Sequence, residues 1–208
     1  MIDFVYFDLG NVLVNFDHDR GCRQVASLAH LTPERVRSII FDSELQAAYE
    51  AGRLTTKEFC EEFNRRAGTR LETAAFAQAA SDIFWLNDPI WPLIDQLLLE
   101  ERRLGVLSNT CDAHWAWVTG HLVPELCQKF DEIVLSFEEG VAKPDSRIYE
   151  LAAARAGVAP ERIFFTDDRP ENISAAQHAG WQAHLFESAQ QTADTLASLG
   201  VTVKFSSE

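Results

Sequence analysis

The hydrophobic pattern begins with a short apolar run, Phe4 to Phe7, which stops at the polar stretch Asp8-Leu9-Gly10-Asn11. Consecutive apolar residues before a turn are typical of a strand that is buried on both faces. From about residue 18 to residue 100 the pattern is helical throughout. Residues that start and stop helices divide this stretch, and we expect helices near 33–41, 43–51, 55–68, 72–81 and 89–101.

After residue 100, short apolar runs alternate with helical stretches. Gly157 and Gly180 fit helix ends, and Pro144 and Pro170 fit helix starts. Alternating strands and helices indicate a parallel sheet that is covered on both faces. The four runs that we expect to be strands are 104–107, 132–135, 162–165 and 182–186.

The change of pattern predicts an α/β fold with a Rossmann-like, doubly wound parallel sheet as its core. An all-helical cap is expected as an insertion after the first strand. The core would comprise residues 1–15 and 90–208, and the cap would comprise residues 16–89. These limits rest on periodicity alone, because no repeat and no linker rich in glycine, serine or proline marks a boundary.

The charge balance narrows the range of partners. Eighteen lysines and arginines stand against 32 aspartates and glutamates, which gives a net charge of −14. Such a field repels nucleic acids and anionic membranes, so we expect neither as a partner. A small anionic ligand is compatible with this charge only if local cations or a bound metal offset it.

Nothing in the pattern resembles a targeting or membrane segment. Residues 1–8 have no basic region and no signal-peptide core. The longest apolar stretch, 89–99, is interrupted by polar residues and is too short to span a bilayer. The cysteines show neither CxxC pairing nor zinc spacing, which favours reduced thiols in a cytoplasmic protein; they are Cys22, Cys60, Cys111 and Cys127.

Four polar clusters lie at or just beyond the ends of expected strands. Ligand-binding groups of parallel sheets gather at the carboxyl ends of the strands, so we expect the four clusters to share one site. They supply a nucleophile, hydroxyl and amide donors, a cation and an acidic pair, which together suit phosphoryl transfer. The clusters are Asp8-Leu9-Gly10-Asn11, Ser108-Asn109-Thr110, Lys143-Pro144-Asp145 and Asp167-Asp168.

Here the sequence resembles the haloacid dehalogenase-like (HAD) hydrolases. The resemblance covers nearly the whole chain, in order, through FDLGNVL, LSNT, AKPD and FFTDDRPENI. The helical insertion sits where that superfamily carries a small helical cap, and YEAGRLTTKEF is similar to a segment of such caps. DLGNV together with the late DD looks most like a bacterial branch of small phosphatases, which includes one that acts on α-glucose 1-phosphate.

The resemblance implies a nucleophile and a metal site. A carboxylate of Asp8 would attack phosphorus and form an aspartyl-phosphate, which water then hydrolyses. Mg²⁺ would be held by Asp8, the main-chain carbonyl of Gly10 and Asp168, with Asp167 as a supporting partner or alternate ligand. The ordinary alternative for each aspartate is a turn former or a helix cap.

The resemblance also implies a phosphate site for a small phosphorylated metabolite. Ser108 and Asn109 would orient the phosphate; the alternative, N-capping of the next helix, does not exclude that role. Lys143 would clamp the phosphate and the nucleophile, although a lone lysine is ordinarily a solvated surface charge. Arg53 lies in the cap segment, with Tyr49 and Gly52, that we expect to face the pocket. Arg169 is expected to be a salt-bridge partner.

The chain departs from the family pattern at Gly10. At this position, two residues after the nucleophile, phosphatases of this superfamily usually have a second Asp. That residue protonates the leaving oxygen and then activates water. Loss of such a group costs about 10² to 10⁴ in rate. Either the substrate needs little protonation, as with a sugar 1-phosphate, or a cap residue substitutes, and the candidates are Glu50, Asp17 and His18. Gly10→Asp should then favour alkyl phosphates over anomeric ones.

The function best supported by the sequence is Mg²⁺-dependent hydrolysis of a small phosphomonoester, expected to be a sugar phosphate. Two alternatives stay open: a dehalogenase in which Asp8 displaces halide, and a phosphate-binding protein that has lost turnover with the acid at position 10. We expect a monomer or a homodimer, because leucines at 93, 97 and 98 fit either the core or a partner. Trp85, Trp91, Trp115 and Trp117 are expected to pack in the core or at the hinge.

Overall fold

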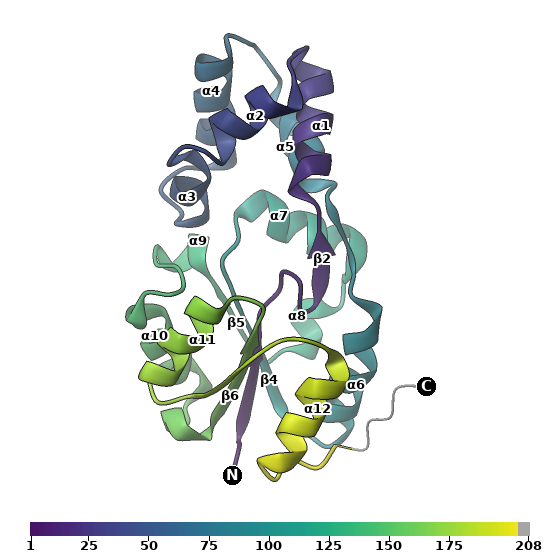
Figure 1. The fold of residues 1–208 in the computed structure, drawn as a ribbon, viewed down its shortest axis with the longest axis vertical. Coiled ribbons are helices and arrows are strands. Elements are labelled where there is room, and N and C mark those ends of the chain that lie inside the picture. The colour runs from purple at the N-terminus through teal and green to yellow at the C-terminus, as the bar shows by residue number, and fades with distance from the viewer. Residues whose placement is uncertain (204–208) are drawn as a thin grey trace.

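The computed structural model describes residues 1–203 and centres on a five-stranded parallel sheet (Figure 1). The strand order is β5-β4-β1-β6-β7, so the first strand of the chain lies in the middle. Each predicted strand is present with small shifts at its ends. The bounds are β1 Phe4–Phe7, β4 Arg103–Ser108, β5 Glu132–Leu135, β6 Ile163–Asp167 and β7 Gln182–Leu185.

The side chains of β1 alternate between two hydrophobic cores, one on each face of the sheet. Val5 and Phe7 belong to one core, and Phe4 and Tyr6 belong to the other. Because both faces are covered, every position of this strand is apolar, which confirms the predicted α/β fold. The covering helices are α6 (Trp91–Leu99) and α12 (Ala189–Ser198) on one face, and α10 (Ser146–Ala156) and α11 (Pro170–His178) on the other.

Five helices form a separate group beyond the carboxyl ends of the strands (Figure 1). They enclose a hydrophobic core in which the ring of Phe76 contacts those of Phe59 and Phe63. Their ends follow the predicted signals, since Thr55 and Glu58 form a complete capping box. The bounds are α1 His18–Ala29, α2 Pro33–Ile40, α3 Leu45–Glu50, α4 Thr56–Ala67 and α5 Thr73–Ser81.

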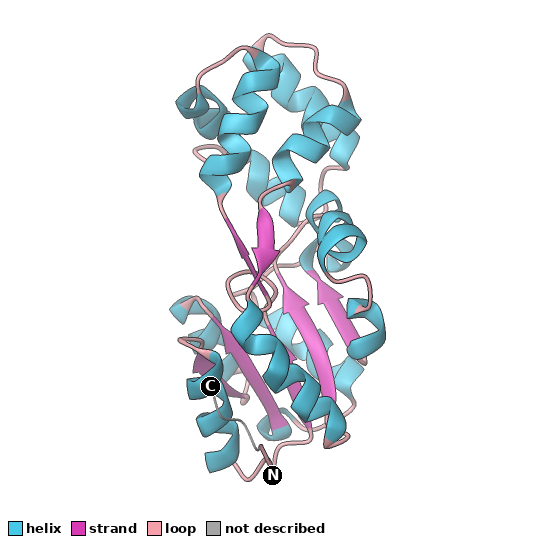
Figure 2. Ribbon diagram, turned by 90° about the vertical axis from the view of Figure 1, so that its right-hand side faces the viewer, coloured by secondary structure: helices cyan, strands magenta, loops and turns pink. Residues whose placement is uncertain are grey.

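The two connections between the helical group and the main sheet are extended, not helical. Strand β2 (Val14–Phe16) pairs antiparallel with β3 (Phe84–Leu86), as Figure 2 shows between the two parts of the molecule. The expectation of helix throughout residues 18–100 was therefore wrong at β3. Three residues are too few to show a strand period, and the pairing joins segments far apart in the sequence. The division into a core (1–15, 90–208) and a cap (16–89) stays a prediction.

The expected helix start at Pro144 was also wrong. Helix α10 begins at Ser146, and the side chain of Asp145 caps it by accepting a hydrogen bond from the backbone N–H of Arg147. Pro144 therefore lies in the loop before the helix, next to Lys143. The remaining elements are the helical segments η1 Asp88–Ile90, α7 Asp112–Trp117, η2 Val118–Leu122, α8 Leu126–Lys129, α9 Ser136–Glu139 and η3 Pro160–Arg162.

The leucines of α6 pack into the core. Leu93 and Leu97 are fully buried, and Leu98 packs against the same cluster. Of the four tryptophans considered, Trp91, Trp115 and Trp117 pack partly against that cluster, as expected. The exception is Trp85, which lies on β3 with 47% of its surface exposed.

Within residues 1–203, no helix combines the length and the apolar character needed to cross a bilayer. Each of the four cysteines is free of disulfides, and three of them are buried.

Candidate active site

The strand order brings the predicted clusters to one edge of the sheet. Asp8 directly follows the central strand β1, Ser108 ends the neighbouring β4, and Asp167 ends β6 on the other side. The backbone N–H of Asp8 donates to the carbonyl of Thr166 at 3.0 Å, so the ladder between the strands continues past the last residue of β1. Three chemically active side chains from distant parts of the sequence therefore lie on adjacent strands.

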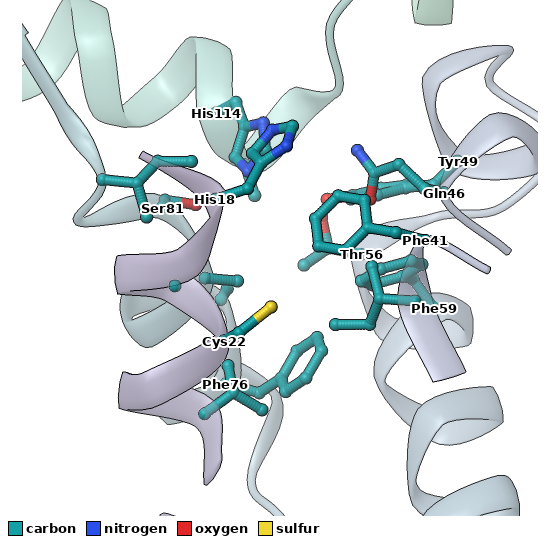
Figure 3. Close-up of a pocket in the computed structure, with 17 residues that line it drawn as sticks. His18, Cys22, Phe41, Gln46, Tyr49, Thr56, Phe59, Phe76, Ser81 and His114 are labelled. Carbon is teal, nitrogen blue, oxygen red and sulfur yellow. The ribbon is translucent and has the colours of Figure 1, made fainter. Parts of the chain in front are cut away.

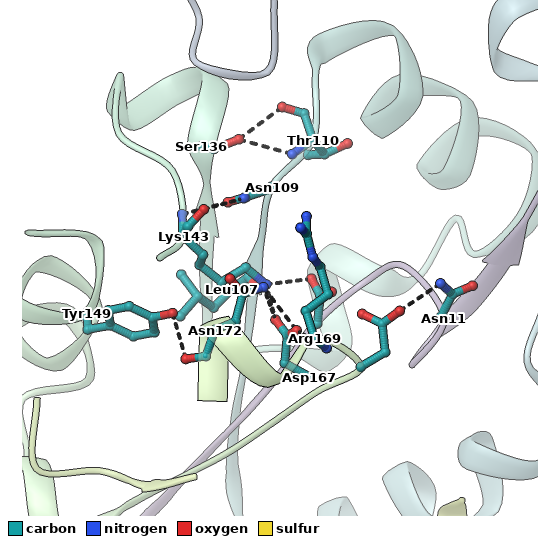
Figure 4. Close-up of polar contacts among 12 residues, drawn as sticks. Asn11, Leu107, Asn109, Thr110, Ser136, Lys143, Tyr149, Asp167, Arg169 and Asn172 are labelled. Carbon is teal, nitrogen blue, oxygen red and sulfur yellow. Dashed lines mark hydrogen bonds and ion pairs between the residues drawn. The ribbon is translucent and has the colours of Figure 1, made fainter. Parts of the chain in front are cut away.

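Lys143 lies buried between two carboxylates. Its Nζ is 2.8 Å from Asp8 Oδ1 and 2.6 Å from Asp167 Oδ2, and it also donates to the carbonyl of Leu107 at 2.8 Å (Figure 4). The side chain of Lys143 is 1% exposed, which excludes the solvated surface alternative. The ion pair with the ammonium holds Asp8 in place and offsets its charge.

Burial and the neighbouring charges shift the pKa values of both Asp8 and Lys143. Burial raises the pKa of Asp8 to about 7, against the lowering effect of Lys143. Burial alone would lower the pKa of Lys143, but the charges of Asp8 and Asp167 raise it above its ordinary value. A carboxyl with so perturbed a pKa in a cleft is a functional-site candidate on physical grounds.

The two aspartates at the end of β6 differ in their surroundings. Asp167 is fully buried, and its oxygens accept from Lys143, from the side chain of Asn172 and from the backbone N–H of Arg169. Asp168 is only partly buried and accepts from Asn11 Nδ2 at 2.8 Å. Asp168 lines the cavity, whereas the oxygens of Asp167 are hydrogen-bonded to protein groups around it. The division between a direct metal ligand, Asp168, and a supporting one, Asp167, stays a prediction.

The acidic cluster fits a bound cation. Asp8, Asp167 and Asp168 each offer a carboxylate oxygen, and these oxygens lie within 4.8 Å of one another. Among the described residues, Lys143 is the cation in ion-pair contact with this cluster. Three carboxylates against one ammonium leave an excess of negative charge, which a hard divalent cation with oxygen ligands would relieve.

A cavity of about 150 Å³ opens above these groups. Ser108, at the end of β4, lines it together with Asn109 and Thr110 from the loop that follows and with Lys143. The side chain of Asn109 is already engaged, because its Nδ2 donates to the carbonyl of Lys143 and its Oδ1 accepts from the backbone N–H of the same residue, both at 2.8 Å. Asn109 thus fixes the loop that carries the lysine, and its role toward substrate stays a prediction.

The position of the missing acid is filled by an aromatic ring. A Cβ atom at Gly10 would lie 2.8 Å from Phe16 Cε1, and Phe16 lines the same cavity from β2. Gly10→Asp would therefore require the ring of Phe16 to shift. The proposed gain for alkyl phosphates from that substitution depends on this rearrangement.

The structure sorts the cap residues that were candidates for the acid or for substrate binding. Glu50 and His18 line the cavity. Asp17 does not, because it caps α1 and pairs with Arg23 on the exposed side. Arg53 is exposed and is not among the cavity residues, so its role in substrate binding stays a prediction without support from the cavity.

Some cavity residues were not singled out from the sequence. Asn11 and Asn172 hold the two aspartates at the end of β6, and both stand inside quoted motifs, so the motifs could have flagged them. His114 and Phe84 also line the cavity, but no local pattern distinguishes them. Arg169 is paired, as expected, although with Glu171 and not with the acidic pair.

The segment around Glu50 is fastened to the sheet-bearing part of the molecule. Ser136 Oγ donates to the carbonyl of Glu50 at 2.6 Å, and the hydroxyl of Tyr49 donates to Asp112 Oδ1 at 2.6 Å. At Gly52, whose φ is +66°, an added Cβ would lie 2.0 Å from the carbonyl oxygen of Phe137. The backbone at Gly52 thus approaches helix α9, which follows β5, as closely as a glycine permits.

We expect Gly52→Ala to separate this segment from helix α9, which carries Phe137. The left-handed backbone alone costs an alanine about 1 kcal/mol, and the clash with a carbonyl adds to this. Gly68→Ala is a matched control, because Gly68 has a φ of +72° but no atom within 4 Å of the added Cβ. Thermal unfolding and steady-state kinetics should show a larger loss for Gly52→Ala in both; equal losses would contradict the close approach.

Comparisons with known proteins identify the family of this chain. The model of the haloacid dehalogenase-like hydrolase family matches residues 2–180. D-ribitol-5-phosphate phosphatase of Bacteroides thetaiotaomicron is 24% identical over 191 residues, which cover 88% of this chain and 90% of that protein. Mouse acyl-CoA dehydrogenase family member 10 is 27% identical over 132 residues, and the match covers 62% of this chain but 12% of that much longer protein.

A solved structure extends the likeness to the fold. It is a HAD family enzyme from Bacteroides thetaiotaomicron in complex with magnesium and inorganic phosphate, with a TM-score of 0.82 at 25% identity, covering 90% of this chain and 96% of that chain. The comparisons support the predicted class, a hydrolase acting on phosphoric monoesters. The chain belongs to the haloacid dehalogenase-like hydrolases.

Proposed function

We propose that the protein is a Mg²⁺-dependent phosphatase that hydrolyses a small phosphomonoester, a sugar or alditol phosphate, through an aspartyl-phosphate on Asp8. One observation carries the proposal: a buried carboxylate stands at the end of the central strand, paired with Lys143 and flanked by two further carboxylates. The relative that acts on D-ribitol 5-phosphate supports the substrate class.

The residues divide the work of the reaction. Lys143 orients Asp8 so that an oxygen of its carboxylate faces the cavity, and the Ser108 hydroxyl lies on the cavity wall where it can donate to the phosphate. Asp8, Asp168 and the Gly10 carbonyl would hold Mg²⁺, with Asp167 fixing its neighbours. When bound, the metal supplies positive charge that offsets the phosphate and the carboxylates. The cap covers the cavity and limits access of water.

The proposal is tested by measuring phosphate release from a panel of phosphorylated metabolites that includes D-ribitol 5-phosphate and sugar 1-phosphates. The same protein should also be assayed for chloride release from 2-chloropropionate, with and without chelator, and for thermal stabilisation by inorganic phosphate. Halide release that persists with chelator would favour the dehalogenase. Stabilisation without turnover would favour the binding protein.

Removal of the metal should abolish turnover. With excess EDTA, phosphate release is expected to fall to background, because the three carboxylates and the substrate phosphate then repel one another without a counter-charge. Addition of Mg²⁺ beyond the chelator should restore it, and the thermal midpoint should rise with Mg²⁺. Phosphate release that is insensitive to EDTA would contradict the metal-dependent mechanism.

A further inference from the structure

The cavity contains titratable side chains from outside the strand-end cluster. Glu50 and His18 come from the cap, and His114 comes from α7. At Gly10, where a side-chain acid could otherwise stand next to the nucleophile, the ring of Phe16 fills the space. A side chain that protonates the leaving group would therefore come from one of the other walls of the cavity.

The backbone contacts described above fix Glu50 in its position. Ser136 holds its carbonyl, and the neighbouring Tyr49 is tied to Asp112, so the end of α3 cannot shift freely. Its side chain lies on the wall of the cavity that contains Asp8. Gln46, one turn earlier on α3, donates to Glu50 Oε1 at 2.7 Å. This contact engages one carboxyl oxygen and leaves the other to carry the proton.

The protonation of the three groups differs in a way that favours Glu50. Burial raises the pKa of Glu50, against the lowering effects of Gln46 and Arg169. Burial lowers the pKa of His114 to about 4 and lowers that of His18, so both rings are poor proton donors near neutral pH. The two rings lie side by side at one end of the neighbouring apolar cavity (Figure 3).

Other groups face Glu50 from the elements packed against it. Arg169 approaches from the loop before α11, and the buried thiol of Cys111 lies before α7. Lys143 and Asp168 share the cavity with it. The charge of Arg169 favours the ionised form of Glu50, and burial of the carboxyl opposes it and raises the pKa.

We propose that Glu50 is the general acid and base of this enzyme, in place of the side chain that Gly10 lacks. In the first step a carboxylate oxygen of Asp8 forms a bond to phosphorus, the bond from phosphorus to the leaving oxygen breaks, and that oxygen takes the proton of Glu50. In the second step a water molecule attacks phosphorus and gives its proton to Glu50. The bond to Asp8 breaks, and inorganic phosphate leaves.

This inference rests on the proposed function, and leaving-group dependence tests it. Glu50→Gln keeps the size of the side chain but has no acidic proton. The measured quantity is kcat/KM, which reports the steps up to transfer of phosphate to Asp8. For the alkyl phosphate hydrolysed fastest in the metabolite panel, we expect a loss of about 10² to 10⁴. For p-nitrophenyl phosphate, whose leaving group needs no proton, we expect a loss below about tenfold.

Two further variants separate chemistry from structure. Glu44→Gln removes an exposed carboxylate at the start of the same helix that makes no side-chain capping bond, and should leave both substrates unaffected. Glu50→Asp keeps an acid and should recover part of the alkyl phosphate activity. The basic limb of the pH profile of kcat/KM for the alkyl phosphate should be present in the wild type and absent in Glu50→Gln.

Three results would overturn the inference. One is an equal loss for both substrates in Glu50→Gln, which would indicate a structural role. Another is an unchanged pH profile. The third is a wild type that hydrolyses p-nitrophenyl phosphate but no alkyl phosphate, because no proton donor would then be acting. In all three cases Asp8→Asn still abolishes turnover if the proposed function holds; phosphate release that survives Asp8→Asn instead defeats the proposed function itself.

Discussion

Replacement of Asp8 by asparagine is expected to abolish phosphate release while leaving the protein folded. An amide cannot form the acyl-phosphate bond, so the loss in kcat should reach about 10⁴-fold or more, as for other residues whose chemistry has no substitute. The size of the side chain is unchanged. Burial already raises the pKa of Asp8 to about 7, so the folded state tolerates a neutral group at this position.

The measurement has two parts. Steady-state phosphate release compares the wild type, Asp8→Asn and Asp42→Asn, in which the substituted aspartate is exposed on the cap. Acid quenching followed by mass spectrometry should find phosphate on the peptide that contains Asp8 in the wild type and not in Asp8→Asn. Activity of Asp8→Asn within tenfold of the wild type would remove the basis of the covalent mechanism.

The sheet and the strand-end clusters could be predicted because their causes are local. A strand buried on both faces must be apolar throughout, and Phe4 to Phe7 shows this directly. Because parallel strands end at the same edge, Asp8 and Asp167 had to come close once their strands were identified. Capping signals such as Thr55 with Glu58 are likewise complete within a few residues.

What the sequence did not predict depends on contacts between distant segments. The pairing of β2 with β3 joins three-residue strands about seventy residues apart, and such short segments show no period. Phe16 lies over Gly10 because a tight turn precedes β2, in which the backbone N–H of Asn11 donates to the carbonyl of Val14. The same holds for Glu50, whose charge would suit an exposed helix end until Ser136 and Phe137 are seen to hold that end over the cavity.

Replacement of Lys143 by methionine is expected to lower both activity and stability strongly. Methionine fills a similar volume, but Asp8 and Asp167 then face each other across a fully buried site without a counter-charge. Removal of one partner from a buried ion pair typically costs about 3–5 kcal/mol. Turnover should fall as well, because the nucleophile loses the contact that orients it.

The stability lost in Lys143→Met should change with pH in one direction, whereas a simple loss of packing would not depend on pH. The folded-state pKa of Asp8 is raised to about 7, whereas an unfolded aspartate titrates near pH 4, so between these values the folded state binds the proton more readily. Without Lys143 the repulsion from Asp167 raises that pKa further. The stability deficit of Lys143→Met should therefore shrink as the pH falls from about 8 to 5, since protonation removes the repulsion.

Chemical denaturation with chelator present measures this deficit without a contribution from bound metal. Lys57→Met is the matched control, because Lys57 is an exposed lysine of α4 that pairs with Glu61 at 3.7 Å, and such surface pairs contribute about 0–1 kcal/mol. A deficit of Lys143→Met that equals the control, or that grows as the pH falls, would show that the ammonium does not hold the two carboxylates together. A large deficit that shrinks in acid would show that it does, since only a buried charge imbalance is relieved by protonation.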